Sequence, residues 1–305
     1  MNKRMSLEQF MRGKINQYFI QSHLRALATS FLEYKLTESF IFSDLTRLHY
    51  QMLGGTSQEI EKAGAAVELM VLALDIYDDL QDRDNLDVPW SQVDPAQALN
   101  VAIGLQSLSI ATLDDCAFSN SSRTRAMRYL NHGILRSVNG QHTDLLNYVN
   151  EEEDCLHMIR NKSGSLIACA CLIGATLVTD EHHELIAQYG QSIGTIGQIR
   201  NDIKGISRWD LRNDLLNRKR TLPILYFLDH DHPIMQIVRD YYEGYASQTD
   251  LLSIKNQIID LIESSGSKQY AEVILRTLQY EAKELIEKLP IEQEWKQKIV
   301  EFVEL

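Results

Sequence analysis

Residues that interrupt helices are scarce in this sequence. Its 305 residues include only 5 prolines and 15 glycines, and the strict polar–apolar alternation of a half-buried strand is nearly absent. Proline removes a helical hydrogen bond and glycine loosens the backbone, so their scarcity permits long helices. Apolar residues recur instead at helical spacing. The sequence therefore predicts an all-α fold.

Basic charge and long apolar runs are also limited. The chain has 30 Lys and Arg residues against 42 Asp and Glu residues, a formal net charge of -12, which argues against nucleic acid and anionic lipid as partners. The first ten residues mix charges where a signal peptide needs an apolar core. The apolar run 165–178 is too short to span a bilayer. We therefore expect a cytoplasmic protein with no stable membrane anchor.

The four cysteines show no spacing typical of a metal site. Cys169 and Cys171 stand two residues apart in a predicted helix, so their side chains point in different directions. The other two, Cys116 and Cys155, are isolated. We expect buried, reduced thiols, as is usual in cytosolic proteins.

No Gly/Ser-rich or Pro-rich linker divides the sequence, so we expect one helical domain over residues 1–305. Thr56 and Glu59 have the spacing of a capping box at a helix start. The segment 205–220 is rich in charge and is either a solvated connection or a loop that closes over an anionic ligand. Between the breaks, helices are predicted at residues 6–35, 40–53, 57–83, 94–118, 122–149, 151–178, 182–204, 220–230, 232–246, 250–264, 266–288 and 290–304.

The most informative feature is a ladder of aspartates at the end of the predicted helix 57–83. These residues lie at i, i+3, i+4 and i+7 and share one helix face: Asp75, Asp78, Asp79 and Asp82. At about 6 Å and an effective dielectric near 20, each pair repels by on the order of 3 kcal/mol. A Mg²⁺ ion shared with a substrate phosphate would neutralise them. A solvated helix end is the alternative, whereas an EF-hand loop is excluded by the missing glycine and glutamate.

A second polar group lies in the predicted helix 182–204. Gln198, Asn201 and Asp202 follow an apolar segment at helical spacing. Two facing helices that each carry oxygen ligands could hold metal ions and a diphosphate between them, with lysines neutralising the remaining charge.

Several segments match one family in order. Asp78-Asp79-Leu80-Gln81-Asp82 has the form DDxxD, 140–145 reads Gly-Gln-x-x-Asp-Leu, 162–166 is close to Lys-Thr-Ala/Gly-x-Leu, and 214–223 is close to Asp-Leu-x-x-Gly-Lys-x-Thr-Leu-Pro. Together these segments resemble the trans-isoprenyl diphosphate synthase family over most of the chain. The resemblance implies a single-domain isoprenoid-synthase helical bundle with a central cavity between two Asp/Asn-bearing helices.

The resemblance also implies residue roles. Mg²⁺ would be held by Asp78, Asp79 and Asp82 on one side and by Asn201 and Asp202 on the other, and the implied catalytic residues are Asp78, Asp79, Asp82, Lys162 and Asp202. The allylic isoprenyl diphosphate would be bound by Lys162, Lys219, Gln198, Leu74 and Ala73. Ala73 occupies the position where the family often adjusts chain length, and its small side chain leaves room for a geranyl or a farnesyl group. Asp75 is either a supporting ligand or an acid behind the ligands.

Departures from the family pattern concern the acceptor. The second aspartate motif is reduced to Asn201 and Asp202, with Gly205 in place of its last aspartate. The family's basic Gly-Gly-Lys-x-x-Arg-Pro segment, which holds isopentenyl diphosphate, is absent, and only Arg47 offers a partial substitute. A diphosphate without such an anchor should bind poorly. This combination is similar to that of the ComQ-type isoprenyltransferases of Bacillus, which modify a tryptophan of a pheromone precursor peptide in quorum sensing.

Two alternatives remain open at this point. One is a short-chain isoprenyl diphosphate synthase that condenses an allylic diphosphate with isopentenyl diphosphate. The other, from a different class, is a non-catalytic helical partner that binds peptide or regulates another enzyme. A terpene cyclase fits less well because Gly205 and Trp209 replace the serine and glutamate of its second motif. Related enzymes are commonly dimers, so a homodimer is a further expectation.

Overall fold

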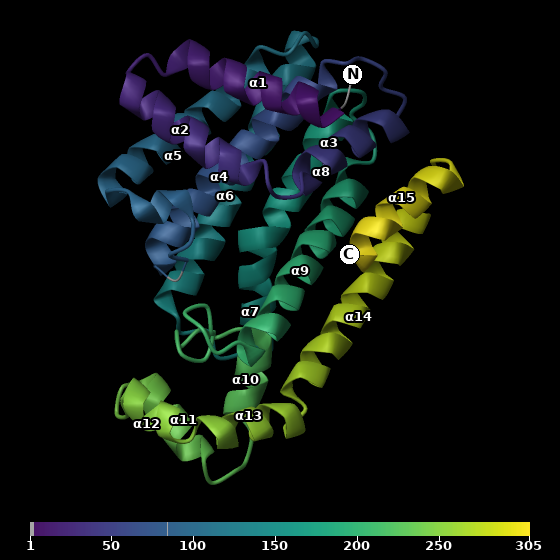
Figure 1. Ribbon diagram of the computed structural model, residues 1–305. Coiled ribbons are helices and arrows are strands. Elements are labelled where there is room, and N and C mark those ends of the chain that lie inside the picture. Colours follow the sequence, from purple (N-terminus) through teal and green to yellow (C-terminus); the bar gives the residue numbers. More distant parts are fainter. Residues whose placement is uncertain (1–2, 84) are drawn as a thin grey trace.

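The computed structural model (Figure 1) describes residues 3–83 and 85–305. Within those ranges it contains helices and no strand, which confirms the predicted all-α class. The elements are α1 (Lys3–Tyr18), α2 (Ser22–Lys35), α3 (Ile41–Met52), α4 (Ile60–Asp82), η1 (Pro89–Gln92), α5 (Pro95–Asp114), α6 (Asn120–Leu146), α7 (Glu152–Ile159), η2 (Arg160–Gly164), α8 (Ser165–Thr176), α9 (His183–Ser207), α10 (Leu222–Leu228), α11 (Met235–Glu243), α12 (Gln248–Ser253), α13 (Lys255–Ser264), α14 (Ser267–Glu287) and α15 (Gln293–Glu304).

Two central helices carry the aspartate and asparagine residues. α4 packs between α5, α3 and α1, and almost every residue from Ile60 to Ala73 is buried. From Leu74 onward the helix becomes partly exposed, because its last turns border a cavity. α9 packs against α8 and α14, and Figure 1 shows α14 running alongside it. The aspartate ladder therefore stands where a core helix emerges from the apolar interior.

A π-helical turn interrupts the predicted helix 151–178. The turn η2 (Arg160–Gly164) separates α7 from α8, and α6 packs directly on it. Gly140 of α6 makes this approach possible, since a Cβ there would lie 2.2 Å from the backbone nitrogen of Lys162. Turns of this kind occur often at functional sites, and this one carries Lys162 into the cavity.

Some predicted boundaries are wrong. The predicted helix 6–35 is split at residues 19–21, where the Gln21 side chain accepts a hydrogen bond from the Leu24 N–H and starts a new helix. The predicted helix 250–264 is split at Ile254. The capping box of Thr56 and Glu59 is also absent. The Glu59 carboxylate instead accepts a hydrogen bond from the backbone N–H of Ala117, at 2.8 Å.

Among the described residues, one helix is long and apolar enough to cross a membrane by length and composition. This helix is α5, and the apolar run named from the sequence, 165–178, lies elsewhere. Its face formed by Val101, Ala102 and Leu105 is buried in the protein and packs on α4, as in a core helix. The four cysteines are free and buried, as predicted.

Candidate active site

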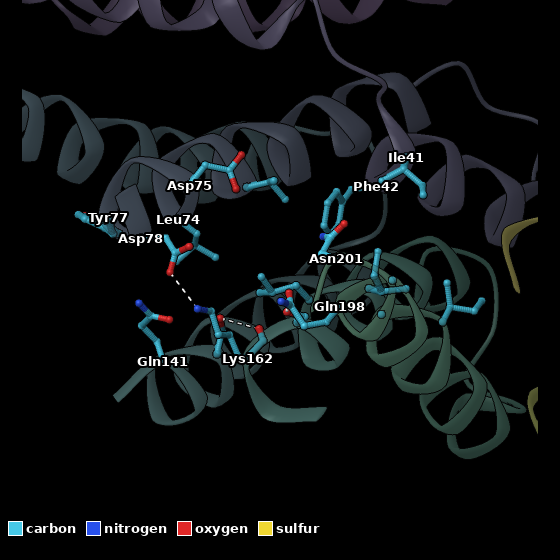
Figure 2. A pocket seen from close by; sticks show the side chains of 18 of the residues that line it. Ile41, Phe42, Leu74, Asp75, Tyr77, Asp78, Gln141, Lys162, Gln198 and Asn201 are labelled. Atoms are coloured by element: carbon cyan, nitrogen blue, oxygen red, sulfur yellow. Dashed lines mark hydrogen bonds and ion pairs between the residues drawn. The ribbon is translucent and has the colours of Figure 1, made fainter. Parts of the chain in front are cut away.

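A cavity of about 700 Å³ lies between α4 and α9 and is also bordered by α3, α6, α8 and α15. The α4 side contributes Asp75 and Asp78, the π turn contributes Lys162, and α9 contributes Gln198 and Asn201. Figure 2 shows the carboxylate of Asp78 directed toward Lys162 across this space. The predicted central cavity between two Asp/Asn-bearing helices is therefore present.

Two lysines approach the aspartate ladder from different segments. Lys162 Nζ lies 3.1 Å from Asp78 Oδ1, and Lys219 Nζ lies 2.7 Å from Asp82 Oδ2. Both also approach the same Asp144 Oδ2 on α6, at 2.7 Å for Lys162 and 3.7 Å for Lys219. Asp144 therefore fixes the two ammonium groups near each other.

The protonation states of Asp144 and the two lysines follow from the ion pairs between them. Burial alone would raise the pKa of Asp144, but the two neighbouring ammonium groups outweigh it and hold the pKa below its ordinary value. Burial opposes the charged form of both lysines, yet the surrounding carboxylates raise the pKa of Lys162 and of Lys219. These lysines stay protonated at neutral pH, so they can bind a phosphate.

Asp79 has a different environment from its neighbours on α4. Its carboxylate accepts hydrogen bonds from Trp90 Nε1 at 2.7 Å and from Asn85 Nδ2 at 3.1 Å. Burial raises the pKa of Asp79 to about 6, although these two donors oppose the change. Trp90 is itself buried between α2 and α5, so Asp79 is tied to the segment after α4 and not to either lysine.

The donor set of the ladder suits a hard cation. Asp82 Oδ1 is buried and accepts no hydrogen bond within the described part of the chain, and Asp78 Oδ1, one helical turn away, is approached by Lys162 alone, at 3.1 Å. Carboxylate oxygens with so few partners are ligands of the kind that Mg²⁺ prefers. The side chains are not gathered around one point, since no group of three or more His, Cys, Asp or Glu among the described residues is arranged to hold a metal ion.

The α9 side is held by hydrogen bonds. Gln198 Nε2 donates to Asp202 Oδ1 at 2.8 Å, and Ser163 Oγ donates to Gln198 Oε1 at 3.0 Å. Asp202 is buried, and its pKa is raised well above the ordinary value by burial and then by the nearby Asp214 carboxylate. Asn201 is exposed at the rim. Asp202 borders a smaller adjoining pocket of about 360 Å³ together with Gln198 and Asn201.

The apolar residues predicted to bind the prenyl group are placed differently from each other. Leu74 lines the cavity, together with Val71 and Leu166. Ala73 is fully buried on the other side of α4, in the apolar cluster shared with α1, α2 and α5, and it is not among the described residues that line the cavity. Its influence on chain length stays a prediction.

Arg47 does not replace the missing basic anchor. Its guanidinium is bound by Glu61 Oε1 and Oε2, at 2.7 and 2.9 Å, and by Asp44 Oδ1 at 2.6 Å. The side chain is nearly buried and lies outside the cavity lining within the described chain. The suggestion that it could hold a second diphosphate is therefore not supported.

Three features of the site had not been predicted. Asp144 was part of a recognised motif, yet nothing in the sequence showed that it joins two lysines. Trp90 carries no local signal for its bond to Asp79. The third is Lys35 of α2, whose buried ammonium lies 3.0 Å from Asp75 Oδ2. All three depend on residues that are distant in the sequence.

Comparison with known proteins identifies the family. The model of the polyprenyl synthetase family matches residues 43–261. The chain belongs to the polyprenyl synthetase family. The match confirms the predicted helical-bundle fold and the class of prenyltransferases.

Individual relatives refine this assignment. The chain is 30% identical over 278 residues to the tryptophan prenyltransferase ComQ of Bacillus spizizenii, covering 90% of this chain and 95% of that protein. It is also 30% identical to ComQ of Bacillus subtilis strain 168, with 95% of each chain covered.

Two solved structures of the family show the same fold. The polyprenyl synthetase of Streptomyces coelicolor A3(2) superposes with a TM-score of 0.84 at 21% identity, covering 99% of this chain and 96% of that one. The geranylgeranyl pyrophosphate synthase of Corynebacterium glutamicum, solved with isoprenyl diphosphate and magnesium, superposes with a TM-score of 0.82 at 16% identity, covering 99% and 96%.

Proposed function

We propose that this protein is a Mg²⁺-dependent isoprenyltransferase that moves a geranyl or farnesyl group from its allylic diphosphate to a tryptophan of a pheromone precursor peptide in the cytoplasm. The observation that carries the proposal is the contrast between two sets of basic residues. Lys162 and Lys219 converge beside the aspartate ladder. Arg47, the one residue that could have replaced the missing basic segment in part, is instead neutralised by two carboxylates. The similarity to two tryptophan prenyltransferases supports the same acceptor.

The residues of the site suit departure of a diphosphate. When the bond between the allylic carbon and its oxygen breaks, the electron pair leaves with the diphosphate, and charge develops on its oxygens. Lys162 and Lys219 stand in fixed positions to stabilise that charge, because Asp144 holds both ammonium groups before the substrate arrives. Preorganised charges of this kind usually supply the largest part of catalysis.

Mg²⁺ would be held by residues of two helices: Asp78, Asp79 and Asp82 on α4, and Asn201 and Asp202 on α9. The ion would neutralise the diphosphate and strengthen it as a leaving group. Asp82 offers a buried oxygen without a hydrogen bond in the described chain for this purpose, and Asp78 offers an oxygen whose one partner in that part of the chain is Lys162. Gln198 keeps the Asp202 carboxylate in place through its hydrogen bond. Binding of the diphosphate would draw the lysines from the carboxylates toward the phosphate oxygens.

The acceptor chemistry is a substitution at carbon. The π electrons of the indole form the new bond to the allylic carbon, and one proton is lost from the acceptor. Val71, Leu74 and Leu166 border the cavity beside Asp78 and would surround the prenyl chain. An apolar lining also keeps water from capturing the allylic cation.

A competition assay tests the proposal. Purified protein and Mg²⁺ receive farnesyl or geranyl diphosphate, with isopentenyl diphosphate and a tryptophan-containing peptide both present, and products are read by mass spectrometry. We expect the peptide to gain one prenyl mass, no extended diphosphate to appear, and a peptide with phenylalanine in place of tryptophan to stay unmodified. Removing Mg²⁺ with a chelator should stop the transfer. Extended diphosphate beside an unmodified peptide would instead indicate a short-chain synthase.

A further inference from the structure

The cavity has an apolar half that the donor site does not use. It is formed by Ile41 and Phe42 at the start of α3, Ile193 of α9, and Phe302 and Leu305 from α15 and the residue after it. Figure 2 shows Ile41 and Phe42 on the opposite side of the pocket from Asp78 and Lys162. We refer to Ile41, Phe42, Ile193, Phe302 and Leu305 as the apolar mouth.

The apolar mouth is one of the parts of the cavity that a large substrate can reach; the other exposed lining residues include Val138 and Leu145 of α6, the helix that packs on the π turn carrying Lys162. Ser39, which precedes it, is exposed, and so are Asn201 and Lys204 on the facing side of α9. Val71 and Leu74, by contrast, belong to the buried helix α4, beside the residues that would hold the diphosphate. The prenyl chain is attached to that diphosphate, so it occupies the α4 side, and a side chain of a peptide enters through the mouth.

The cations around the mouth are paired with carboxylates, hydrogen-bonded to backbone carbonyls or exposed to solvent. Lys35, buried just behind Asp75, lies 3.0 Å from both Asp75 Oδ2 and Glu38 Oε2. Arg200 Nη2 donates to the carbonyl oxygens of Val303 and Glu304, at 3.3 and 2.9 Å, and Lys204 stands exposed in solvent. A second diphosphate would lose its hydration against Ile41, Phe42 and Phe302, and among the described residues around the mouth no buried cation is left without a partner to compensate for that loss.

An aromatic side chain meets the opposite situation. An indole buries about 150–250 Å² of surface, most of it apolar, and gains further from edge or offset contact with another ring. Phe42 is half-buried at the mouth and offers such a ring. We propose that the apolar mouth binds the indole of the acceptor tryptophan and that Phe42 determines the acceptor specificity of the enzyme. This proposal rests on the proposed function and adds the place of the acceptor.

Steady-state kinetics of Phe42→Ala test the assignment. We expect the KM for the peptide to rise about tenfold or more, because the variant loses one aromatic contact and each ~1.4 kcal/mol of lost binding free energy is a factor of ten. The KM for farnesyl diphosphate should stay within about twofold, because the donor contacts are untouched. The matched control is Phe118→Ala. Phe118 is also half-buried, contacts the ring of Tyr50 and lies outside the cavity lining within the described chain. That variant should leave both KM values unchanged.

A second variant, Phe42→Leu, keeps the test valid if Phe42→Ala does not fold. It keeps most of the volume and removes the ring, and circular dichroism verifies the fold. A several-fold rise in the peptide KM alone supports the proposal. A rise in the farnesyl diphosphate KM alone would show that the mouth holds the prenyl chain, and unchanged kinetics in both Phe42 variants would show that the indole binds elsewhere. A wild-type protein that extends the diphosphate and never modifies peptide would overturn the proposed function as well, so the two failures are distinguishable.

Discussion

At the scale of single residues, the aspartate ladder is stabilised by a different partner for each carboxylate. Neighbouring carboxylates on α4 would repel each other if they were left bare. Ammonium groups from other segments relieve this repulsion, and Asp79 uses neutral donors. The ion pairs and hydrogen bonds are Asp75 with Lys35, Asp78 with Lys162, Asp82 with Lys219, and Asp79 with Trp90 and Asn85. The ladder is thus stable before any cation binds.

Glu68 provides a prediction about pH at this scale. Its Oε1 accepts the Ser43 N–H at 2.8 Å, while Oε2 has no hydrogen bond within the described chain. Burial raises the pKa of Glu68 from 4.5 to about 7, against the opposing effects of Lys35 and Ser43. The folded protein therefore keeps a proton that the unfolded chain releases. This contribution is fully present below pH 4.5 and is lost as pH rises toward 7 and above.

The variant Glu68→Gln removes this titration. Relative to the variant, the wild-type free energy of unfolding should fall by about 3 kcal/mol between pH 4.5 and pH 8. Urea unfolding of both proteins at several pH values measures the difference. His49, whose pKa burial lowers to about 4, acts in the opposite direction but is common to both proteins and cancels. Parallel pH profiles would mean that Glu68 is not protonated in the folded state.

At the scale of helices, close backbone contact determines where Lys162 stands. α6 touches the π turn at Gly140, and the Ser137 hydroxyl of α6 donates to the carbonyl oxygen of Lys162 at 2.9 Å. The π turn adds one residue to the helix, which turns Lys162 toward Asp144 on α6. The position of Lys162 therefore depends on how α6 packs on the π turn.

Gly140→Ala tests this dependence. Its Cβ would collide with backbone atoms of the π turn, so we expect a loss of about 1–3 kcal/mol in stability and a lower kcat, since Lys162 must move. The matched control is Gly13→Ala on the exposed side of α1, where a Cβ meets no described atom within 4 Å. That control should gain up to about 1 kcal/mol from higher helix propensity. Chemical denaturation and turnover rates measure both effects, and equal stability of the two variants would contradict the argument.

At the scale of the whole molecule, a small lobe supports the site from one end. α11, α12 and α13 gather at the end of the bundle away from α1 and α2 (Figure 1) and share their own apolar core. Tyr242 OH of this lobe donates to the carbonyl oxygen of Lys219 at 3.0 Å. Asn147, at the end of α6, donates to the carbonyl oxygen of Arg218 at 2.6 Å. The charged segment 205–220 is therefore anchored, and its end delivers Lys219 to Asp82.

Tyr242→Phe should weaken donor binding without unfolding the protein. Loss of one neutral hydrogen bond costs about 1 kcal/mol, so we expect the KM for farnesyl diphosphate to rise by about threefold to tenfold as Lys219 loses its support. Tyr245→Phe is the matched control, because Tyr245 is 85% exposed on the same lobe. Kinetics and thermal melting of both variants provide the measurement. Identical KM values for the two variants would show that the lobe does not position Lys219.

Local patterns were sufficient for much of the fold. Helical periodicity and the scarcity of proline located most helices, because both act within a few residues. The split at residues 19–21 escaped prediction, since Phe19 and Gln21 are ordinary helix residues and the break depends on how α1 and α2 pack. The π turn escaped for a similar reason. Its signal is the contact with Gly140, which lies on another helix.

The sequence alone determined the all-α class, the burial of the cysteines, the aspartate ladder on one face of α4 and the resemblance to the family. The first three follow from composition or from residue spacing along one helix, and the resemblance follows from the order of short motifs along the chain. Only the tertiary structure decided which charged residues form ion pairs with each other. Lys219 and Asp82 are separated by 137 positions in the sequence, and Lys35 and Asp75 are separated by 40. It also decided that Arg47 is neutralised and that Ala73 faces the core. Pairings of this kind depend on how the helices pack, and spacing along a single helix does not specify that packing.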